Sequence, residues 1–193
     1  MAASTLMTIK SGEAEEREDA AIEEALAAGD YREAITRCAR THGAAIGRLC
    51  MALVGSQADA EELAQETLVE AHKSFHTYRA EGTARAFLFG IARHLCARHL
   101  ETRTRREAKL RLVHNADAPS NDTGDMLERC QRAEQARAAL RELRPTERDA
   151  VVLRFQSGLS FREVAASCGV DEATARKRVS RAVVRLRALL GDA

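Results

Sequence analysis

Cationic side chains recur at helical spacing near the C-terminal end of the sequence, where they could bind a nucleic acid. Lysine and arginine neutralise phosphate groups, which fixes the register of a protein on a duplex. Arginine also donates paired hydrogen bonds to the edge of guanine, so a mixture of these residues suits both backbone and base contacts. The candidate DNA-contacting residues are Thr174, Arg176, Lys177, Ser180, Arg181 and Arg185.

Residues 159–190 have the pattern of a helix, a tight turn and a longer second helix, which is a helix-turn-helix. Ser160 and Glu163 can form a capping box, Gly169 stands where the chain must turn, and Asp171 can accept the amide hydrogens of the second helix. The apolar residues of the second helix recur every three to five positions, at Val170, Ala175, Val179, Val183, Leu186 and Leu190. An ordinary solvated surface helix is the alternative, and it does not account for the turn.

Acidic and amide side chains gather in a second segment, 59–75. Gly55 ends the helix before it, and Ser56 with Asp59, or Asp59 with Glu62, forms its start signal. We expect Leu63, Leu68 and Val69 to face inward. Acids in the first turn also stabilise a helix through its dipole, but that structural alternative does not explain the glutamine. The outward side chains are predicted to be Asp59, Glu61, Glu62, Gln65 and Glu66.

An aromatic ring and several cations follow at a break in the helical pattern, residues 76–83, and on the helix after it. Unstacked bases can lie on an aromatic ring while arginines hold the phosphates, so this group suits single-stranded DNA. The apolar residues of the same helix are interpreted as core. The candidate contacts are Tyr78, Arg79, Arg93, His94 and Arg98; the candidate core residues are Phe87, Phe89, Ile91 and Leu95.

Three blocks together resemble the extracytoplasmic-function, or group 4, sigma factors of the bacterial sigma-70 family. Residues 143–190, LRPTERDAVVLRFQSGLSFREVAASCGVDEATARKRVSRAVVRLRALL, are similar to region 4 of that family. DAEELAQETLVEAHKSF and FLFGIARHLCARHL are similar to region 2. The resemblance covers roughly residues 20–190, and it departs from the usual family residues at Phe87, often Trp, and at His94, often Asn.

The resemblance implies a dissociable subunit of RNA polymerase that directs initiation at promoters of a stress or signal regulon. It implies that the C-terminal helix reads the −35 element as duplex, and that Tyr78, Arg79, Arg93, His94 and Arg98 grip the melted −10 element. The acidic helix, Asp59 to Glu66, would dock on the β′ clamp. The implied partners are core RNA polymerase (β′ clamp and β flap), promoter DNA and an anti-sigma factor, with a monomer when the chain is free of them.

Composition predicts an all-α fold with two small helical domains joined by a flexible linker. Aromatic residues make up only 4% of the 193 residues and Trp is absent, which fits helical bundles better than a sheet core. Residues 112–126 lose the helical period and collect Asn, Asp, Pro, Ser and Gly. The predicted organisation is an acidic mobile tail at 1–19, a first domain at 20–111, the linker at 112–126, and the helix-turn-helix domain at 127–193.

The net charge of +1 hides a segregation of charge along the chain. Residues 11–30 hold eight acids against one base, whereas residues 85–111 hold eight bases against two acids. Such an arrangement gives the molecule a directed field, and the basic stretch and the last helix offer two footprints for a polyanion.

Catalytic and metal chemistry are the other uses of these residue types. His72 and His76, like Cys38 and His42, stand four apart, yet neither pair has visible further ligands or a general base. We therefore predict no catalytic residue, no metal site and no cofactor. Five scattered cysteines without a CxxC pair argue against a disulfide framework, and the lack of a membrane span or signal peptide favours a cytoplasmic protein.

Two further classes of function remain as alternatives. A stand-alone helix-turn-helix transcriptional regulator would use its N-terminal half to sense a ligand or to dimerise, and a hydrolase would use the His and Cys pairs. The acidic helix at 59–75 discriminates between the classes, because a repressor needs no polymerase-docking surface. It favours the sigma factor.

Overall fold

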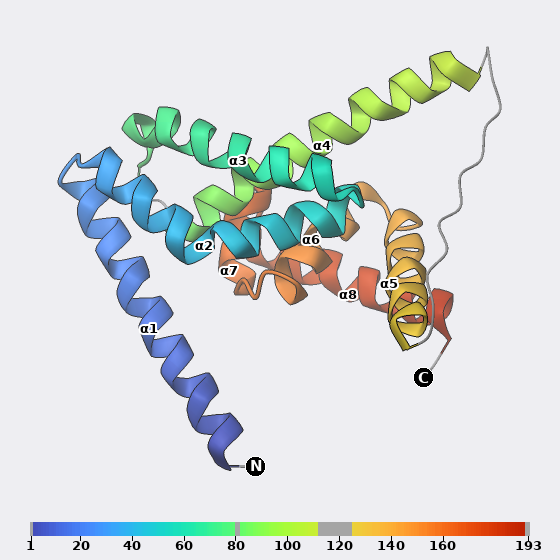
Figure 1. The fold of residues 1–193 in the computed structure, drawn as a ribbon, viewed down its shortest axis with the longest axis horizontal. Helices are drawn as coiled ribbons and strands as arrows, with labels where there is room; N and C mark the ends of the chain where they lie inside the picture. The colour runs from blue at the N-terminus through green and yellow to red at the C-terminus, as the bar shows by residue number, and fades with distance from the viewer. Residues whose placement is uncertain (1, 80–81, 112–124, 192–193) are drawn as a thin grey trace.

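The chain is all helical in the computed structural model, which describes the backbone of residues 2–79, 82–111 and 125–191 and the side chains of 14–79, 82–106 and 133–191. No strand occurs in these residues, so the predicted all-α fold is confirmed. The elements, shown in Figure 1, are α1 (Ala2–Ala27), α2 (Tyr31–Val54), α3 (Gln57–Ser74), η1 (Phe75–Thr77), α4 (Ala84–Arg111), α5 (Asp125–Arg141), α6 (Pro145–Phe155), α7 (Phe161–Cys168) and α8 (Glu172–Leu190).

The helix boundaries follow the local signals in the sequence. Ser160 and Glu163 form the predicted capping box of α7, in which each side chain bonds to the other residue's backbone amide. Gly169 ends α7 in the left-handed region, with a φ of 63°, and Asp171 caps α8 through the amide of Thr174 at 2.8 Å. These three predictions are confirmed.

The first four helices form an N-terminal unit whose core lies between α1, α2, α3 and α4. Ile22 of α1, Ile46 and Leu49 of α2 and Phe89 of α4 are fully buried in it. Among the residues interpreted as core, Leu95 is buried as well, whereas Phe87 and Ile91 are half-buried.

The boundary expected at residue 20, after the predicted mobile tail at 1–19, lies inside a helix, because α1 runs from Ala2 to Ala27. Its acids find bases on α2: Glu18 lies 3.3 Å from Arg37 and 3.0 Å from Arg40. Asp19 lies 2.8 Å from the fully buried ring of His42. These ion pairs join segments about twenty residues apart, which explains why the acidic composition alone suggested a free tail.

Helices α5 to α8 form the C-terminal unit, in which α6, α7 and α8 pack on one another and α5 packs on α8. Leu153, Val164 and Ala175 are fully buried between the three inner helices. Of the predicted linker at 112–126, residues 112–124 lie outside the described residues, and Asp125 already begins α5.

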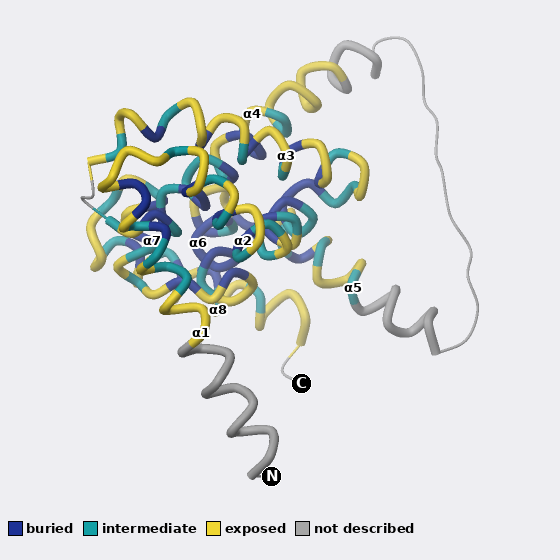
Figure 2. Tube along the Cα trace, turned by 60° about the vertical axis from the view of Figure 1, so that its left-hand side comes forward, coloured by how far each residue is buried: buried dark blue, intermediate teal, exposed yellow. Residues whose placement is uncertain are grey.

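The two units pack directly against each other through α4 and α7, with a smaller contact between α2 and α6. Figure 2 shows buried segments of α2 and α6 in the middle of the molecule. Gly90 lies at this contact: a methyl group at that position would already touch the carbonyl oxygen of Ser167 at 3.4 Å, so a larger side chain there would meet the backbone of α7. The buried hydroxyl of Ser167 donates to the carbonyl of Ala86 at 2.8 Å.

Candidate nucleic-acid and polymerase interfaces

The outer face of α8 presents an exposed cationic surface, as the sequence predicted. Arg176, Lys177, Ser180, Arg181 and Arg185 are all exposed, and Thr174 is half-buried. Ala175, Val179 and Ala182 are buried on the opposite side, so the packing of α8 against α6 and α7 fixes which side chains point outward. The six C-terminal candidates thus lie on one helix, and the cationic side of that helix is exposed to solvent.

Arg176 is held in place before any ligand binds. Its guanidinium lies 4.4 Å from the centre of the Phe161 ring, at cation–π distance, and pairs with the carboxylate of Glu172 one turn earlier. Thr174 is less available, because its hydroxyl and its amide both donate to Asp171. Those hydrogen bonds lower the pKa of the Asp171 carboxyl and keep it charged at the start of α8.

Arg185 has a structural contact that the sequence did not reveal. Its guanidinium lies 3.6 Å from the carboxylate of Glu147, whose side chain is only 7% exposed. Glu147 belongs to the first turn of α6, so the pair joins α6 to α8. Arg185 therefore neutralises a buried charge as well as facing solvent.

The region 2-like candidates surround a cavity of about 750 Å³ between α3, the 77–83 loop and α4. Tyr78, Arg79, His94 and Arg98 line it, so the structure brings four of the five candidates for the −10 element together. Ala166 and Ser167 of α7 form part of its wall.

Tyr78 is half-buried, and its ring packs edge-on against Phe87 with centroids 5.4 Å apart. Its hydroxyl lies 3.0 Å from the Glu23 carboxylate and 2.6 Å from the carbonyl oxygen of Gly82. Burial raises the pKa of Tyr78, and the negative charge of Glu23 raises it further. The phenol therefore stays protonated as a hydrogen-bond donor.

Arg93, the fifth candidate, points away from the cavity and toward the C-terminal unit. Its guanidinium donates to the carbonyl oxygen of Ser167 at 3.1 Å and pairs with Asp149 at 3.3 Å. Arg85 behaves alike, since it donates to the carbonyl oxygen of Ser157 at 2.8 Å. In this arrangement Arg93 and Arg85 hold the two units together.

Asp149 lies in the contact between the units with a side chain that is 11% exposed. Burial raises the pKa of its carboxyl, and the nearby guanidinium groups of Arg93 and Arg148 offset part of that rise. Separation of the units would return this carboxylate to water.

The outer face of α3 carries the predicted acidic surface: Glu61, Glu62, Gln65 and Glu66 are exposed. Asp59 is half-buried, and its carboxylate lies 3.4 Å from the ring of His99 on α4. The expectation that Val69 faces inward is wrong, since 53% of Val69 is exposed. The buried residues of α3 are Ala60, Leu63, Thr67 and Ala71, a spacing that places Val69 on the outer side.

An apolar groove of about 520 Å³ lies between α5, α6 and α8. It is lined by Phe155 and Leu190, which are 68% and 52% exposed. Val183 and Leu186 of α8 complete the apolar surface between them. This groove is on the C-terminal unit and is separate from the cationic side of α8.

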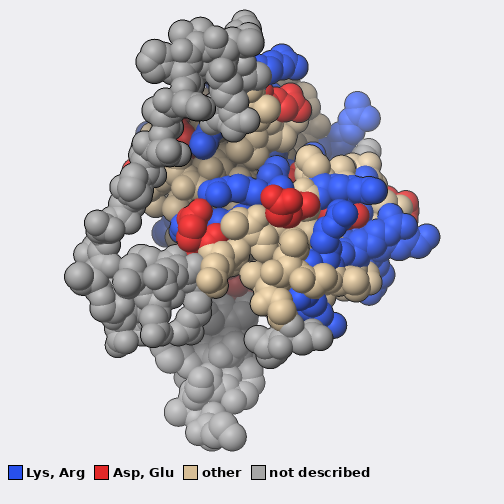
Figure 3. Space-filling model, turned by 90° about the vertical axis from the view of Figure 1, so that its right-hand side faces the viewer, with Lys and Arg blue, Asp and Glu red and all other residues tan. Residues whose placement is uncertain are grey.

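Charge is spread unevenly over the surface. Figure 3 shows Lys and Arg side chains gathered along one edge of the face it presents, with Asp and Glu between them toward the middle. Among the described helices, none is both long and apolar enough to cross a bilayer. Among the described side chains, no three His, Cys, Asp or Glu gather where they could hold a metal ion.

Cys38, Cys50, Cys96 and His42 are buried in the packing of the N-terminal unit, whereas His72 and His76 are exposed. Burial and the charges of Asp19 and Glu23 raise the pKa of Cys38 to about 12, so its thiol is protonated. Cys50 and Cys96 meet between α2 and α4 as free thiols, and Cys168 is free as well. The side chain of Cys130 lies outside the described residues.

Two side chains with a part in these surfaces were not singled out by the sequence. Phe161 lies under Arg176, and Glu23 reaches the 77–83 loop from α1. Phe161 and Arg176 lie on the two helices of the helix-turn-helix, one on each side of its turn. Their places in this motif could have indicated that the Phe161 ring lies against Arg176. No local signal joins Glu23 to a loop more than fifty residues later.

Comparison with known proteins follows the same division into two units. Residues 38–106 match Sigma-70 region 2, and residues 133–186 match Sigma-70, region 4. The ECF RNA polymerase sigma factor SigC of Mycobacterium tuberculosis is 32% identical over 148 residues, which are 74% of this chain and 75% of SigC. The ECF RNA polymerase sigma factor SigM of the same organism is 31% identical over 179 residues, 91% of this chain and 86% of SigM.

A solved structure is also similar. The sigma factor RpoE of Bartonella quintana, in complex with the anti-sigma factor NepR, superposes with a TM-score of 0.63 at 27% sequence identity. The similarity covers 82% of this chain and 98% of that one.

Proposed function

Because this chain belongs to the sigma-70 family and is an RNA polymerase sigma factor of the extracytoplasmic-function type, we propose that its two units read two separate promoter elements for core RNA polymerase. The observation that carries this proposal is the pair of cationic surfaces, one on α8 and one around the cavity at α4. The chain would contribute binding and positioning but no catalytic residue, and it would act in the cytoplasm with the polymerase.

The −35 element is assigned to α8. A major groove admits one helix, and the exposed side of α8 offers arginines for guanine edges and phosphates. The Phe161 ring and Glu172 hold Arg176 in one orientation, which reduces the conformational entropy lost when it contacts a base. Arg176, Lys177, Ser180 and Arg181 are the proposed reading residues, with Arg185 and Thr174 at the edges.

The −10 element is assigned to the cavity between α3, the 77–83 loop and α4. Tyr78 offers an aromatic surface at its wall, while Arg79 and Arg98 supply cations for phosphates. His94 lies on the same wall and is placed to contact a base. A concave site of this kind accepts an unstacked base better than a duplex.

Contact of Arg93 with the −10 element also requires the two units to move apart. Arg93 is assigned to the −10 element, yet its guanidinium is engaged with Ser167 and Asp149 of the C-terminal unit. Ala166 and Ser167 narrow the cavity as well. We propose that the packed arrangement is the state free of DNA, and that α7 leaves α4 when the promoter binds.

Two surfaces are proposed for polymerase. The acidic side of α3, with Glu61, Glu62, Gln65 and Glu66, is suited to a basic surface such as the β′ clamp, and Asp59 of the same helix lies against His99 of α4. The apolar groove between α6 and α8 is suited to an apolar segment of the β flap. The RpoE structure with NepR supports an anti-sigma factor as a further protein partner.

Co-purification with core RNA polymerase tests the docking proposal. Glu62→Lys reverses a charge on the exposed side of α3, so its affinity for core RNA polymerase should fall. The affinity of the unaltered chain and of the variant should also fall as the salt concentration rises. Glu33→Lys on α2 provides a control at another exposed acid. Equal core affinity for the Glu62 and Glu33 variants at low salt would remove the docking assignment.

A further inference from the structure

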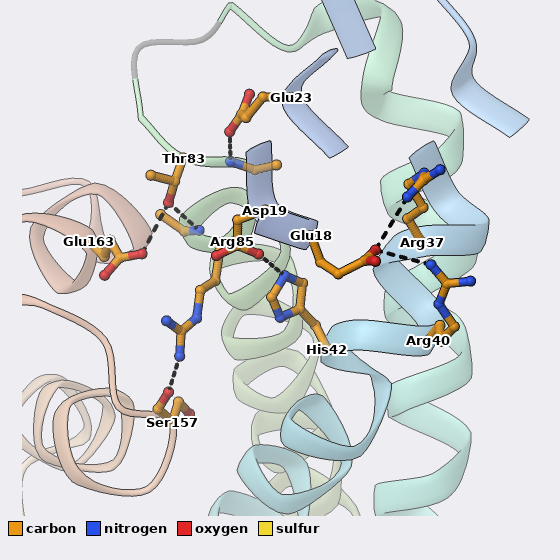
Figure 4. A network of polar contacts seen from close by, with 12 residues as sticks. Glu18, Asp19, Glu23, Arg37, Arg40, His42, Thr83, Arg85, Ser157 and Glu163 are labelled. Carbon is orange, nitrogen blue, oxygen red and sulfur yellow. Dashed lines mark hydrogen bonds and ion pairs between the residues drawn. The ribbon is translucent and has the colours of Figure 1, made fainter. Parts of the chain in front are cut away.

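Glu23 holds both ends of the loop that precedes α4. One of its carboxylate oxygens accepts the backbone amide of Ala84, the first residue of α4, at 2.5 Å. Both oxygens also lie near the hydroxyl of Tyr78, at 3.0 and 3.1 Å. Figure 4 shows Glu23 reaching the start of α4 from a separate helix.

The position of Glu23 is fixed by the packing of α1. Ile22 is fully buried and Leu26 is 8% exposed, so this turn of α1 is seated in the core. One turn earlier, Glu18 pairs with Arg37 and Arg40, and Asp19 contacts His42 (Figure 4). Glu23 thus extends from a part of α1 that is anchored on α2.

The two contacts of Glu23 differ in what they do. The contact with Ala84 satisfies an amide at the N-terminus of α4, where a negative charge is favourable. The contact with Tyr78 fixes the phenol and therefore the direction of the ring, which stands at the wall of the −10 cavity. Thr83 already caps α4 through the amide of Ala86, so the helix does not depend on Glu23 alone.

We propose that Glu23 is a positioning residue for the −10 element, which sets where Tyr78 and Arg79 stand when the melted strand arrives. The inference rests on the proposed role of this loop. Glu23 lies before residue 38, where the match to Sigma-70 region 2 begins, so α1 becomes part of the promoter-reading apparatus.

The test uses the full chain with core RNA polymerase and a promoter fragment recovered by run-off transcription. Glu23→Ala removes both contacts and should lower the rate of open-complex formation about tenfold, as expected for a charge-assisted hydrogen bond. Glu24→Ala is the matched control, because it removes the neighbouring, exposed acid of α1 and should change the rate by less than about twofold. Core affinity and duplex −35 binding should stay unchanged in both.

A second readout separates positioning from folding. If Glu23 sets the ring of Tyr78, Glu23→Ala should change the preference among base substitutions in the −10 element. Tyr78→Phe should then cost less in the Glu23→Ala background than in the unaltered chain, because the hydrogen bond to Glu23 is already lost and only the contact with the carbonyl oxygen of Gly82 remains. Additive effects of the two substitutions, or unaltered base preference, would overturn the proposal.

Two other results would have a different meaning: unfolding of Glu23→Ala, and normal promoter opening without Tyr78 or Arg79. If Glu23→Ala unfolds the chain, Glu23→Gln decides, since its amide oxygen can still accept from both the Ala84 amide and the Tyr78 hydroxyl, as one carboxylate oxygen of Glu23 does. A folded Glu23→Gln chain should therefore keep normal opening and base preference, and a changed base preference would contradict the positioning role. If Tyr78→Ala and Arg79→Ala open the promoter normally, the assignment of the loop fails instead, and the Glu23 role fails with it.

Discussion

The two helices proposed to contact DNA, α8 and α4, differ in how many of their cationic side chains are already engaged in contacts within the chain. On α8, the cations Arg176, Lys177, Arg181 and Arg185 are exposed, and the contacts of Arg176 and Arg185 stay within the C-terminal unit. On α4, His94 and Arg98 face the cavity, while Arg93 and Arg85 are bound to α7, α6 and the turn that joins them. One surface is complete in the free chain, and the other shares its side chains with a neighbouring unit.

This difference indicates an order of events. A duplex could reach α8 without rearrangement, because no described side chain of the N-terminal unit holds its arginines. If Arg93 contacts the melted strand as proposed, α7 must leave α4 first, because Arg93 is bound to Ser167 and Asp149. Each of the following substitutions tests this difference between α8 and α4.

The largest effect should come from Gly90→Leu, which places a side chain where a methyl group already lies 3.4 Å from Ser167. Overpacking typically costs about 1 to 3 kcal/mol, so the equilibrium should shift toward separated units by roughly tenfold or more. Small-angle scattering of the free chain should report a larger radius of gyration. Binding of a single-stranded −10 oligonucleotide should strengthen, while duplex −35 binding stays the same.

Gly43→Leu is the control for that experiment. Gly43 also lies within a helix, but nothing stands within 4 Å of a methyl group built there. Its scattering and DNA binding should match those of the unaltered chain. If Gly90→Leu is as compact as Gly43→Leu, the packing of α4 on α7 does not limit access to the −10 surface.

Two arginines of α8 should have different roles: Arg176 contacts a base, and Arg185 stabilises the C-terminal unit. Arg176→Ala should lose about 1 to 3 kcal/mol of discrimination at one base pair of the −35 element with little change in thermal stability. Arg185→Ala strands the buried carboxylate of Glu147, so it should destabilise the C-terminal unit by about 1 to 3 kcal/mol and weaken binding to every sequence. Binding to a set of −35 variants, with thermal melts, measures both. Identical profiles for the two variants would contradict base reading by Arg176.

Tyr78→Ala should reduce open-complex formation by roughly tenfold, since stacking of one base on an aromatic ring contributes about 1 to 3 kcal/mol. Closed-complex binding through α8 should persist, because Tyr78 lies on the other unit. A promoter mismatched across the −10 region should recover part of the loss if the ring assists melting. Loss of helical circular dichroism from the N-terminal unit would instead assign the ring to the core beside Phe87.

The smallest effect should come from pH. Burial raises the pKa of Asp149 in the folded chain, so the folded state holds its proton more tightly than the unfolded state. Stability from this group is therefore highest below the ordinary aspartate pKa and is lost as pH rises through the raised value. Asp149→Asn should flatten this dependence, so denaturant melts across the acidic range should show the variant gaining relative to the unaltered chain as pH rises. Parallel curves would contradict the assignment.

What the sequence could predict was local. Ser160 with Glu163, Gly169 and Asp171 are signals within a few residues of the helix ends they determine, and all were confirmed. The exposed side of α8 followed from its apolar period.

What the sequence could not predict joins distant segments. Arg93 meets Ser167 and Asp149, which are 74 and 56 residues away, and no local pattern announces such pairs. The acidic segment 1–19 shows the same limit, because Glu18 and Asp19 contact side chains of α2 that lie more than twenty residues later. The apolar side chain of Val69 predicts an inward position, but Val69 is exposed. The helical spacing of the buried residues Leu63 and Thr67 places Val69 on the outer side of α3.

Run-off transcription tests the central claim most directly, namely that this chain gives core RNA polymerase its promoter specificity through both units. Genomic fragments should yield discrete transcripts that appear only when core enzyme and this chain are both present. Each should weaken when either the −35 or the −10 element of its template is altered. Tight duplex binding without any chain-dependent transcript would contradict the account and would instead indicate a stand-alone helix-turn-helix regulator.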